Sequence, residues 1–120
     1  MPLTGKLENN NLAVLEVTGQ LGKAEVDKMQ TVLAPIMQKV GKIKTLIFLK
    51  DFKGWESGKD WDDTSFSDEN DAYLQKMAIV GDEKWRDLVT LFTLKGLRPV
   101  PIEYFGPDEE EKARQWLDSE

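Results

Sequence analysis

The 120-residue sequence contains neither cysteine nor histidine. Without cysteine there is no disulfide, no thiolate nucleophile and no thiolate metal ligand. Without histidine there is no imidazole base near neutral pH, so a Ser-His-Asp arrangement cannot be built. Zinc sites of the usual kind are excluded for the same reason. Enzymatic chemistry would have to depend on carboxylate, lysine, tyrosine or serine side chains, and we predict no catalytic residue, no metal site and no cofactor.

The sequence also lacks a long apolar run and a basic patch. No segment approaches the roughly 18 apolar residues of a membrane-spanning helix, and the N-terminus does not resemble a signal peptide, so we expect a cytoplasmic protein. The 16 basic and 22 acidic residues give a net charge of −6. This charge opposes binding to nucleic-acid phosphates and to anionic lipid, although it does not exclude shallow insertion of apolar side chains into a membrane. We predict no nucleic-acid partner.

The length, and the absence of repeats and linkers, favour a single domain over residues 1–120. Leu3–Leu7 and Leu12–Val17 are predicted strands joined by a short polar turn, so they should pair antiparallel. Apolar residues then recur at spacings of three and four from Val26 to Val40, which predicts an amphipathic helix. Pro35 lies inside this helix and is expected to kink or break it.

Three further strands are predicted. Ile43–Lys50 is a nearly continuous apolar run, typical of a central strand covered on both faces, and Ala78–Val80 is a shorter one. Val100–Phe105 alternates between apolar and other residues. Because Pro101 has no N–H group, we place this strand at the edge of the sheet. The alternation of strands and helices predicts right-handed βαβ connections and a largely parallel sheet.

Two helices are predicted near the C-terminus. Asp82 can cap the first, whose predicted buried stripe consists of Trp85, Leu88, Val89 and Phe92. Pro107 is expected to open the second. Glu110 and Arg114 are four residues apart and should pair on its surface.

The segment Asp51–Gln75 is acidic but holds several large aromatic residues. A helix from about Asp62 would place four residues on one face, namely Phe66, Tyr73, Leu74 and Met77. Such a stripe offers few anchors, so we expect this element to be the most mobile of the chain.

Several residues resemble the SpoIIAA-like family, a branch of the STAS-type fold. The resemblance is carried by three groups of residues. Two of them are Ala78-Ile79-Val80-Gly81 with Trp85, and Tyr104-Phe105 with Ala113, Trp116 and Leu117. The third is a predicted turn after the central strand, Phe52-Lys53-Gly54-Trp55, followed by Trp61-Asp62. It implies an α/β domain with a mixed five-stranded sheet, mostly parallel, flanked by about four helices. It also implies a protein without enzyme activity that binds partners, nucleotides or apolar ligands.

Related STAS regulators are phosphorylated on a serine in the turn that opens the helix after the third strand. The corresponding stretch here, Lys50–Trp55, contains no serine. Ser57 and Ser65 follow in the next segment and are the candidate phosphorylation sites of one alternative, a protein-interaction regulator of the anti-sigma factor antagonist type. A carboxylate-based enzyme is a more distant alternative, because nothing in the sequence brings two carboxylates together.

The main hypothesis is a binding site for an apolar small molecule, a lipid or a membrane surface. Members of the SpoIIAA-like branch have been considered for this role through the helix after the central strand. The candidate residues here are Phe52, Trp55, Trp61, Phe66, Tyr73, Trp85, Val89 and Phe92. The competing interpretation is that these aromatic side chains simply fold back onto the sheet. A protein partner or a helix-mediated homodimer is compatible with either.

Overall fold

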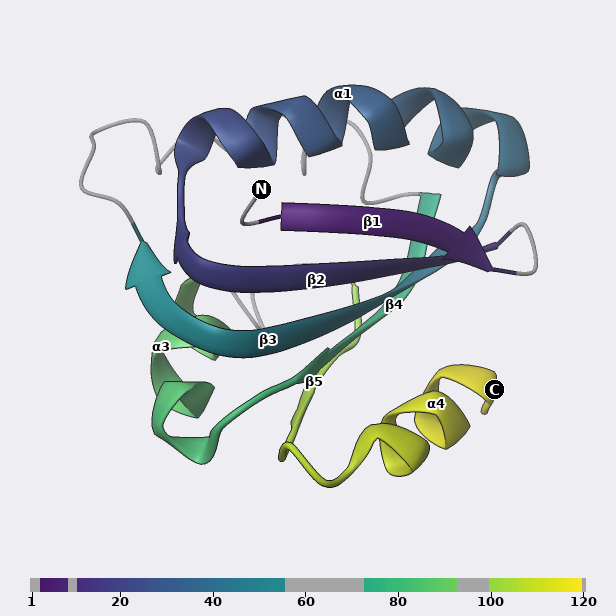
Figure 1. Ribbon diagram of the computed structural model, residues 1–120. Helices are drawn as coiled ribbons and strands as arrows, with labels where there is room; N and C mark the ends of the chain where they lie inside the picture. Colours follow the sequence, from purple (N-terminus) through teal and green to yellow (C-terminus); the bar gives the residue numbers. More distant parts are fainter. Residues whose placement is uncertain (1–2, 9–10, 56–72, 93–99, 120) are drawn as a thin grey trace.

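The computed structural model describes residues 3–8, 11–55, 73–92 and 100–119. Its elements, in chain order, are β1 (Leu3–Glu8), β2 (Leu12–Leu21), α1 (Lys23–Val40), β3 (Ile43–Trp55), β4 (Leu74–Val80), the 3-10 helix η3 (Glu83–Trp85), α3 (Arg86–Phe92), β5 (Ile102–Phe105) and α4 (Glu110–Asp118). The strands form one five-stranded sheet in the order β1-β2-β3-β4-β5 (Figure 1). Only β1 runs antiparallel to its neighbour, and the other pairs are parallel. The mixed, mostly parallel sheet is therefore confirmed, with β3 at its centre and β5 at one edge. The predicted strand Val100–Phe105 is shortened, because β5 begins at Ile102, directly after Pro101.

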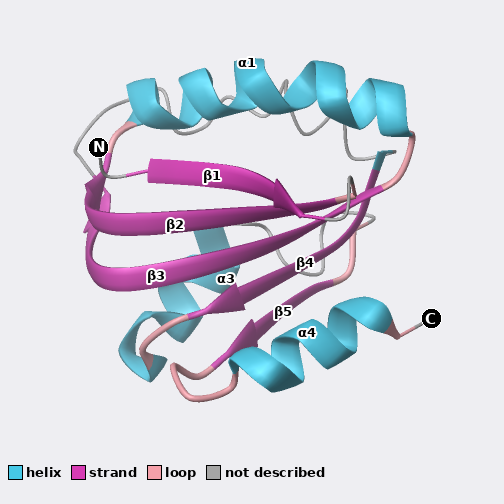
Figure 2. Cartoon of the chain, turned by 45° about the vertical axis from the view of Figure 1, so that its right-hand side comes forward, coloured by secondary structure: helices cyan, strands magenta, loops and turns pink. Residues whose placement is uncertain are grey.

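Helices cover both faces of the sheet. Along β3, Ile43 and Ile47 belong to one apolar cluster while Leu46 and Phe48 belong to another. Because successive side chains of a strand point to opposite faces, these are the two cores of the domain. The first core includes side chains of α1 and α3, and the second includes side chains of α4. Figure 2 shows α1 and α4 on opposite sides of the sheet.

The predicted break at Pro35 is wrong, because α1 continues through this residue to Val40. Pro35 is exposed, so the carbonyl group that loses its N–H partner in the preceding turn can be hydrated. On either side, Leu33, Ile36 and Met37 pack against the sheet. Tertiary packing of this stripe holds the helix together across the missing hydrogen bond.

The helices near the C-terminus differ from the prediction in two details. Leu88, predicted to be buried, is 51% exposed. Val89 of the same predicted stripe is buried, as expected. A 3-10 turn precedes α3, and its tighter repeat turns Leu88 away from the sheet. The second helix begins at Glu110 rather than at Pro107, because the residues between form a turn. The predicted surface pair of Glu110 and Arg114 is present at 2.9 Å.

The predicted helix from about Asp62 lies largely outside the described residues. Its last two expected members, Leu74 and Met77, belong to β4 instead, where they are partners of Ile43 and Thr45. Against about four helices predicted, the described residues contain three α-helices and the 3-10 helix. None of those α-helices has the length and hydrophobicity of a membrane span.

Candidate functional site

Three aromatic rings meet where β3 ends. The ring centres of Phe52 and Trp85 are 4.8 Å apart, those of Phe52 and Trp55 are 5.2 Å apart, and those of the two tryptophans 6.1 Å. All three pairs are edge-to-face, an arrangement in which the positive edge of one ring meets the negative face of another. We call this group the aromatic trio.

Two extra residues in β3 bring the trio together. Between Lys50 and Phe52 the strand advances two residues while β2 advances one, and between Phe52 and Trp55 it advances three while β2 advances two. Each insertion reverses the alternation of side chains, so Phe52 and Trp55 both join the core covered by α1 and α3. Asp51 and Gly54 have the left-handed φ angles, 50° and 95°, that these bulges require. The prediction of a turn at 52–55 is corrected accordingly: the stretch is an irregular strand.

The trio is partly covered. Phe52 is 7% exposed, and Trp55 and Trp85 are half-buried. Val89 is buried in the same core, and Tyr73 packs against it half-buried. The structure thus places five of the predicted site residues in one apolar cluster. Trp61, Phe66, Ser57 and Ser65 lie outside the described residues, as does the side chain of Phe92.

The residues on either side of Trp85 in the chain form hydrogen bonds with one another and with Tyr104. The Tyr104 hydroxyl donates a hydrogen bond to the carbonyl oxygen of Asp82 at 2.7 Å. Burial raises the pKa of Tyr104 to about 12. The Arg86 guanidinium forms two 2.7 Å hydrogen bonds with the Glu83 carboxylate, donates to the Tyr104 carbonyl oxygen at 3.1 Å and lies 5.1 Å from the centre of its ring. This pairing holds the pKa of Glu83 below its usual value.

These contacts join the end of β4 to the end of β5 and so stabilise the fold. A Cβ atom at Gly81 would lie 2.7 Å from the Tyr104 hydroxyl oxygen, so the two strands approach closely there because position 81 is glycine. Within the described residues, no group of three carboxylates is placed to hold a metal ion. The exposed and part-buried contacts of Asp82, Glu83, Arg86 and Tyr104 supply neither a nucleophile with its base nor a pair of carboxylates facing a cavity.

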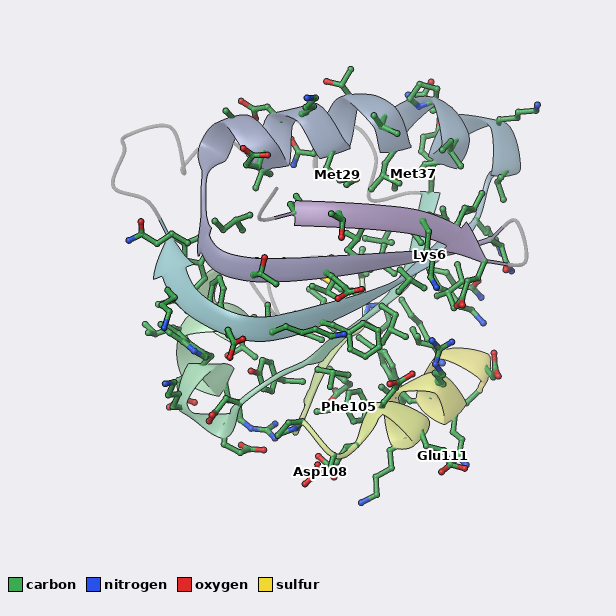
Figure 3. The ribbon with its side chains drawn as sticks, viewed as in Figure 1. Lys6, Met29, Met37, Phe105, Asp108 and Glu111 are labelled. Carbon is green, nitrogen blue, oxygen red and sulfur yellow. The ribbon has the colours of Figure 1, made fainter. Side chains whose placement is uncertain are left out.

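A second feature was not predicted from the sequence. A groove of about 470 Å³ lies between α1 and β1, and we call it the α1–β1 groove. Its walls come from β1, β2 and α1, with the described lining residues Leu3, Thr4, Gly5, Lys6, Leu7, Ala13, Leu15, Glu25, Lys28, Met29, Val32, Leu33 and Ile36. In Figure 3, Met29 projects from α1 toward β1. The sequence feature that could have indicated the groove is the glycine at position 5 of a strand that packs against the long apolar stripe of α1.

Comparisons with known proteins address the family and the fold. A family model described as SpoIIAA-like matches residues 12–118. Among solved structures, an uncharacterised protein of the DUF3478 family with a SpoIIAA-like fold, from Shewanella loihica PV-4, is similar with a TM-score of 0.72 and 17% identity. The similarity covers 96% of this chain and 91% of that one. A search of curated proteins gives no match.

Proposed function

The chain belongs to the SpoIIAA-like family, and from this premise we propose that it is a non-enzymatic regulatory domain that binds an apolar ligand or a membrane surface at the aromatic trio. The single observation that carries the proposal is the irregular end of β3. Asp51, which is not a glycine, has a left-handed backbone conformation. The two bulges of β3 bring Phe52 and Trp55 into contact with Trp85. Bulges are over-represented beside functional sites.

The location supports the same reading. In open α/β sheets, ligands bind beyond the carboxyl ends of the parallel strands, and this is where β3 ends and where β4 leads into η3. Trp55 and Trp85 keep part of their surface accessible, while Phe52 and Val89 form a buried base beneath them. Half-buried tryptophans over an apolar base suit an acyl chain or the interfacial region of a bilayer.

Quenching by brominated lipid tests this proposal. The probes are stearate carrying bromine on its acyl chain and phosphatidylcholine vesicles with brominated chains, because bromine quenches tryptophan emission only at short range. The chain has four tryptophans. We expect saturable quenching that decreases in Trp85→Phe, which removes a reporter at the trio, and in Trp55→Phe. The matched control is Trp116→Phe, because Trp116 belongs to the other core.

Two results would count against the proposal. One is the absence of both quenching and co-flotation with vesicles while the circular dichroism spectrum shows a folded protein. The other is quenching that falls in Trp116→Phe but not in Trp85→Phe or Trp55→Phe, which would move the apolar site to the opposite face of the sheet.

A further inference from the structure

The α1–β1 groove runs along an edge of the sheet. β1 is the first strand in the sheet order and, among the described strands, pairs with β2 alone, so its outer edge carries N–H and C=O groups of alternate residues. Within the described part of the chain, no strand pairs with that edge. Five consecutive β1 residues, Leu3 to Leu7, line the groove. A strand added at this edge would therefore have backbone partners and would run beside the groove.

The two walls of the groove have matching lengths. The α1 residues on its wall run from Glu25 to Ile36 at helical spacings of three and four. Eleven residue steps along a helix cover roughly 16 Å. Four residue steps along β1, from Leu3 to Leu7, cover roughly 14 Å. The groove thus has the dimensions of one extended segment of about five residues lying between a strand and a helix.

The groove is apolar and partly open to solvent. Val32 is 56% exposed and Leu7 is 40% exposed, although both are apolar residues that line the groove. Gly5 lets the side chains of Leu15 and Met29 pack directly against the β1 backbone, because a Cβ atom there would lie 2.7 Å from Leu15 Cδ2 and 3.1 Å from Met29 Cε. An occupant that places alternate apolar side chains in the groove would cover Val32 and Leu7.

The charges favour an occupant with carboxylates. On β1, Lys6 alternates with the groove-lining leucines and so faces away from α1, and its side chain is 69% exposed with only a 3.9 Å contact to Glu8. Glu8 is also held by Arg114 at 3.1 Å. On α1, Lys28 lines the groove beside Glu25. A strand added beside β1 would therefore meet the exposed Lys6 ammonium group on the face away from α1, although the whole chain is acidic.

A second copy of this chain fits less well. Antiparallel self-pairing of β1 centred on Lys6 would put the two Lys6 side chains directly opposite, and centring it on Gly5 would make them diagonal neighbours. Like charges in these positions are destabilising. Centring on Leu7 would pair Lys6 with Glu8, but it would use only half of the strand and compete with Arg114 for Glu8.

We propose that the α1–β1 groove binds an extended segment of about five residues from a partner protein, which joins the sheet beside β1. Its alternate apolar side chains lie in the groove against Val32 and Leu7. The side chains between them are carboxylates that face Lys6 across the strands. The groove thus gives this domain a peptide-binding surface that is separate from the aromatic trio.

Capped five-residue peptides that alternate glutamate with valine, leucine or phenylalanine are suitable probes. Added to isotope-labelled protein, they should shift the backbone amide signals of β1 and the Met29 methyl signal in a saturable way. N-methylation of the peptide nitrogens that face β1 should abolish these shifts, because it removes the hydrogen-bond donors of the ladder. Lys6→Glu should weaken binding roughly twofold to fivefold and should favour peptides with lysine in place of glutamate.

A pair of matched variants tests the groove itself. Val32→Glu places a charge at the groove and should weaken binding roughly tenfold. Leu91→Glu is the control, because Leu91 is a 71% exposed apolar residue on a different helix, and it should bind as the wild type does. Both positions are exposed, so neither variant should unfold the protein.

Three outcomes would overturn the proposal. The first is that no peptide of the set causes shifts at millimolar concentration while the protein is folded. The second is that N-methylated peptides bind equally well, which would make the groove a site for apolar side chains or small molecules rather than for a strand. The third is a dimer in sedimentation equilibrium that Val32→Glu dissociates, which would assign the groove to a second copy. Each is independent of the brominated-lipid experiment.

Discussion

Lys76 of β4 binds the C-terminal end of α4 by contacting both the carbonyl group and the ring of Trp116. Its ammonium group donates to the Trp116 carbonyl oxygen at 2.6 Å and lies 4.8 Å from the centre of the Trp116 ring. It also donates to the carbonyl and hydroxyl oxygens of Ser119, at 2.6 Å and 2.8 Å. The Trp116 carbonyl oxygen also accepts from the N–H and hydroxyl groups of the C-cap Ser119, at 3.2 Å and 2.6 Å. A cation bonded to the last turn and the cap at the negative end of a helix holds α4 on the sheet.

Replacing Lys76 should therefore destabilise the domain. Lys76→Met keeps most of the aliphatic stem but removes the charge and the three hydrogen bonds, and we expect a loss of about 1–2 kcal/mol in the free energy of unfolding. Urea unfolding followed by circular dichroism measures it. Lys112→Met is the control, since Lys112 is 71% exposed and pairs only with Glu109 at the surface. Equal stability of the two variants would show that the contacts of Lys76 contribute nothing.

Tyr104 makes the stability depend on alkaline pH. Its pKa in the folded protein is about 12, against 10.0 for an unperturbed tyrosine. Between these values the unfolded chain loses the hydroxyl proton while the folded chain keeps it, so stability falls as pH rises from about 10 to about 12. The contribution lost is on the order of 2 kcal/mol. Below pH 10 this group adds no pH dependence.

Tyr104→Phe isolates this effect from the titration of lysines. The variant should lose about 1 kcal/mol at neutral pH, because the Asp82 carbonyl oxygen loses one of its two donors and keeps only the Trp85 N–H group. Its decline in stability between pH 10 and 12 should be shallower than that of the wild type, measured by urea unfolding at each pH. Parallel declines in the two proteins would show that the Tyr104 hydroxyl ionises normally in the folded state.

The order and type of most helices and strands could be predicted, because the spacing of apolar residues and the positions of turn residues depend directly on secondary structure. The apolar run of Ile43–Lys50 predicted the central strand, and Pro101 predicted an edge strand. The irregular end of β3 could not be predicted, since Asp51–Trp55 reads as a turn until its partner residues on β2 are known. The exposure of Leu88 depends on the 3-10 turn before it. The α1–β1 groove depends on how far α1 stands from β1, which no periodicity encodes.

The bulges of β3 predict that substitutions at Gly54 and Asp51 change the free energy of unfolding by different amounts. Gly54→Ala puts a Cβ atom on a residue with φ of 95° and should cost about 1–2 kcal/mol. The contact it makes is not the cause, because the nearest atom of the Trp85 ring would be at an ordinary 3.5 Å. Asp51→Gly should change stability by less than about 0.5 kcal/mol, since aspartate tolerates left-handed backbone better than most residues. A neutral Gly54→Ala would mean that β3 can straighten.

Arg114 of α4 connects the last helix to the first strand, and a double-mutant cycle measures that link. Its guanidinium donates to the Glu8 carboxylate at 3.1 Å and to Glu110 at 2.9 Å. Because the Arg114 side chain is 38% exposed and that of Glu8 is 31% exposed, we expect a coupling energy of only about 0.5–1 kcal/mol, decreasing with added salt.

The cycle combines Arg114→Met with Glu8→Gln, and a parallel cycle with Glu110→Gln supplies the comparison for a pair within one helix. The Glu8 coupling should be the larger of the two, because it joins elements at opposite ends of the chain and is lost whenever α4 leaves the sheet. If only the Glu110 cycle shows coupling, the contact between Glu8 and Arg114 does not help to hold α4 in place.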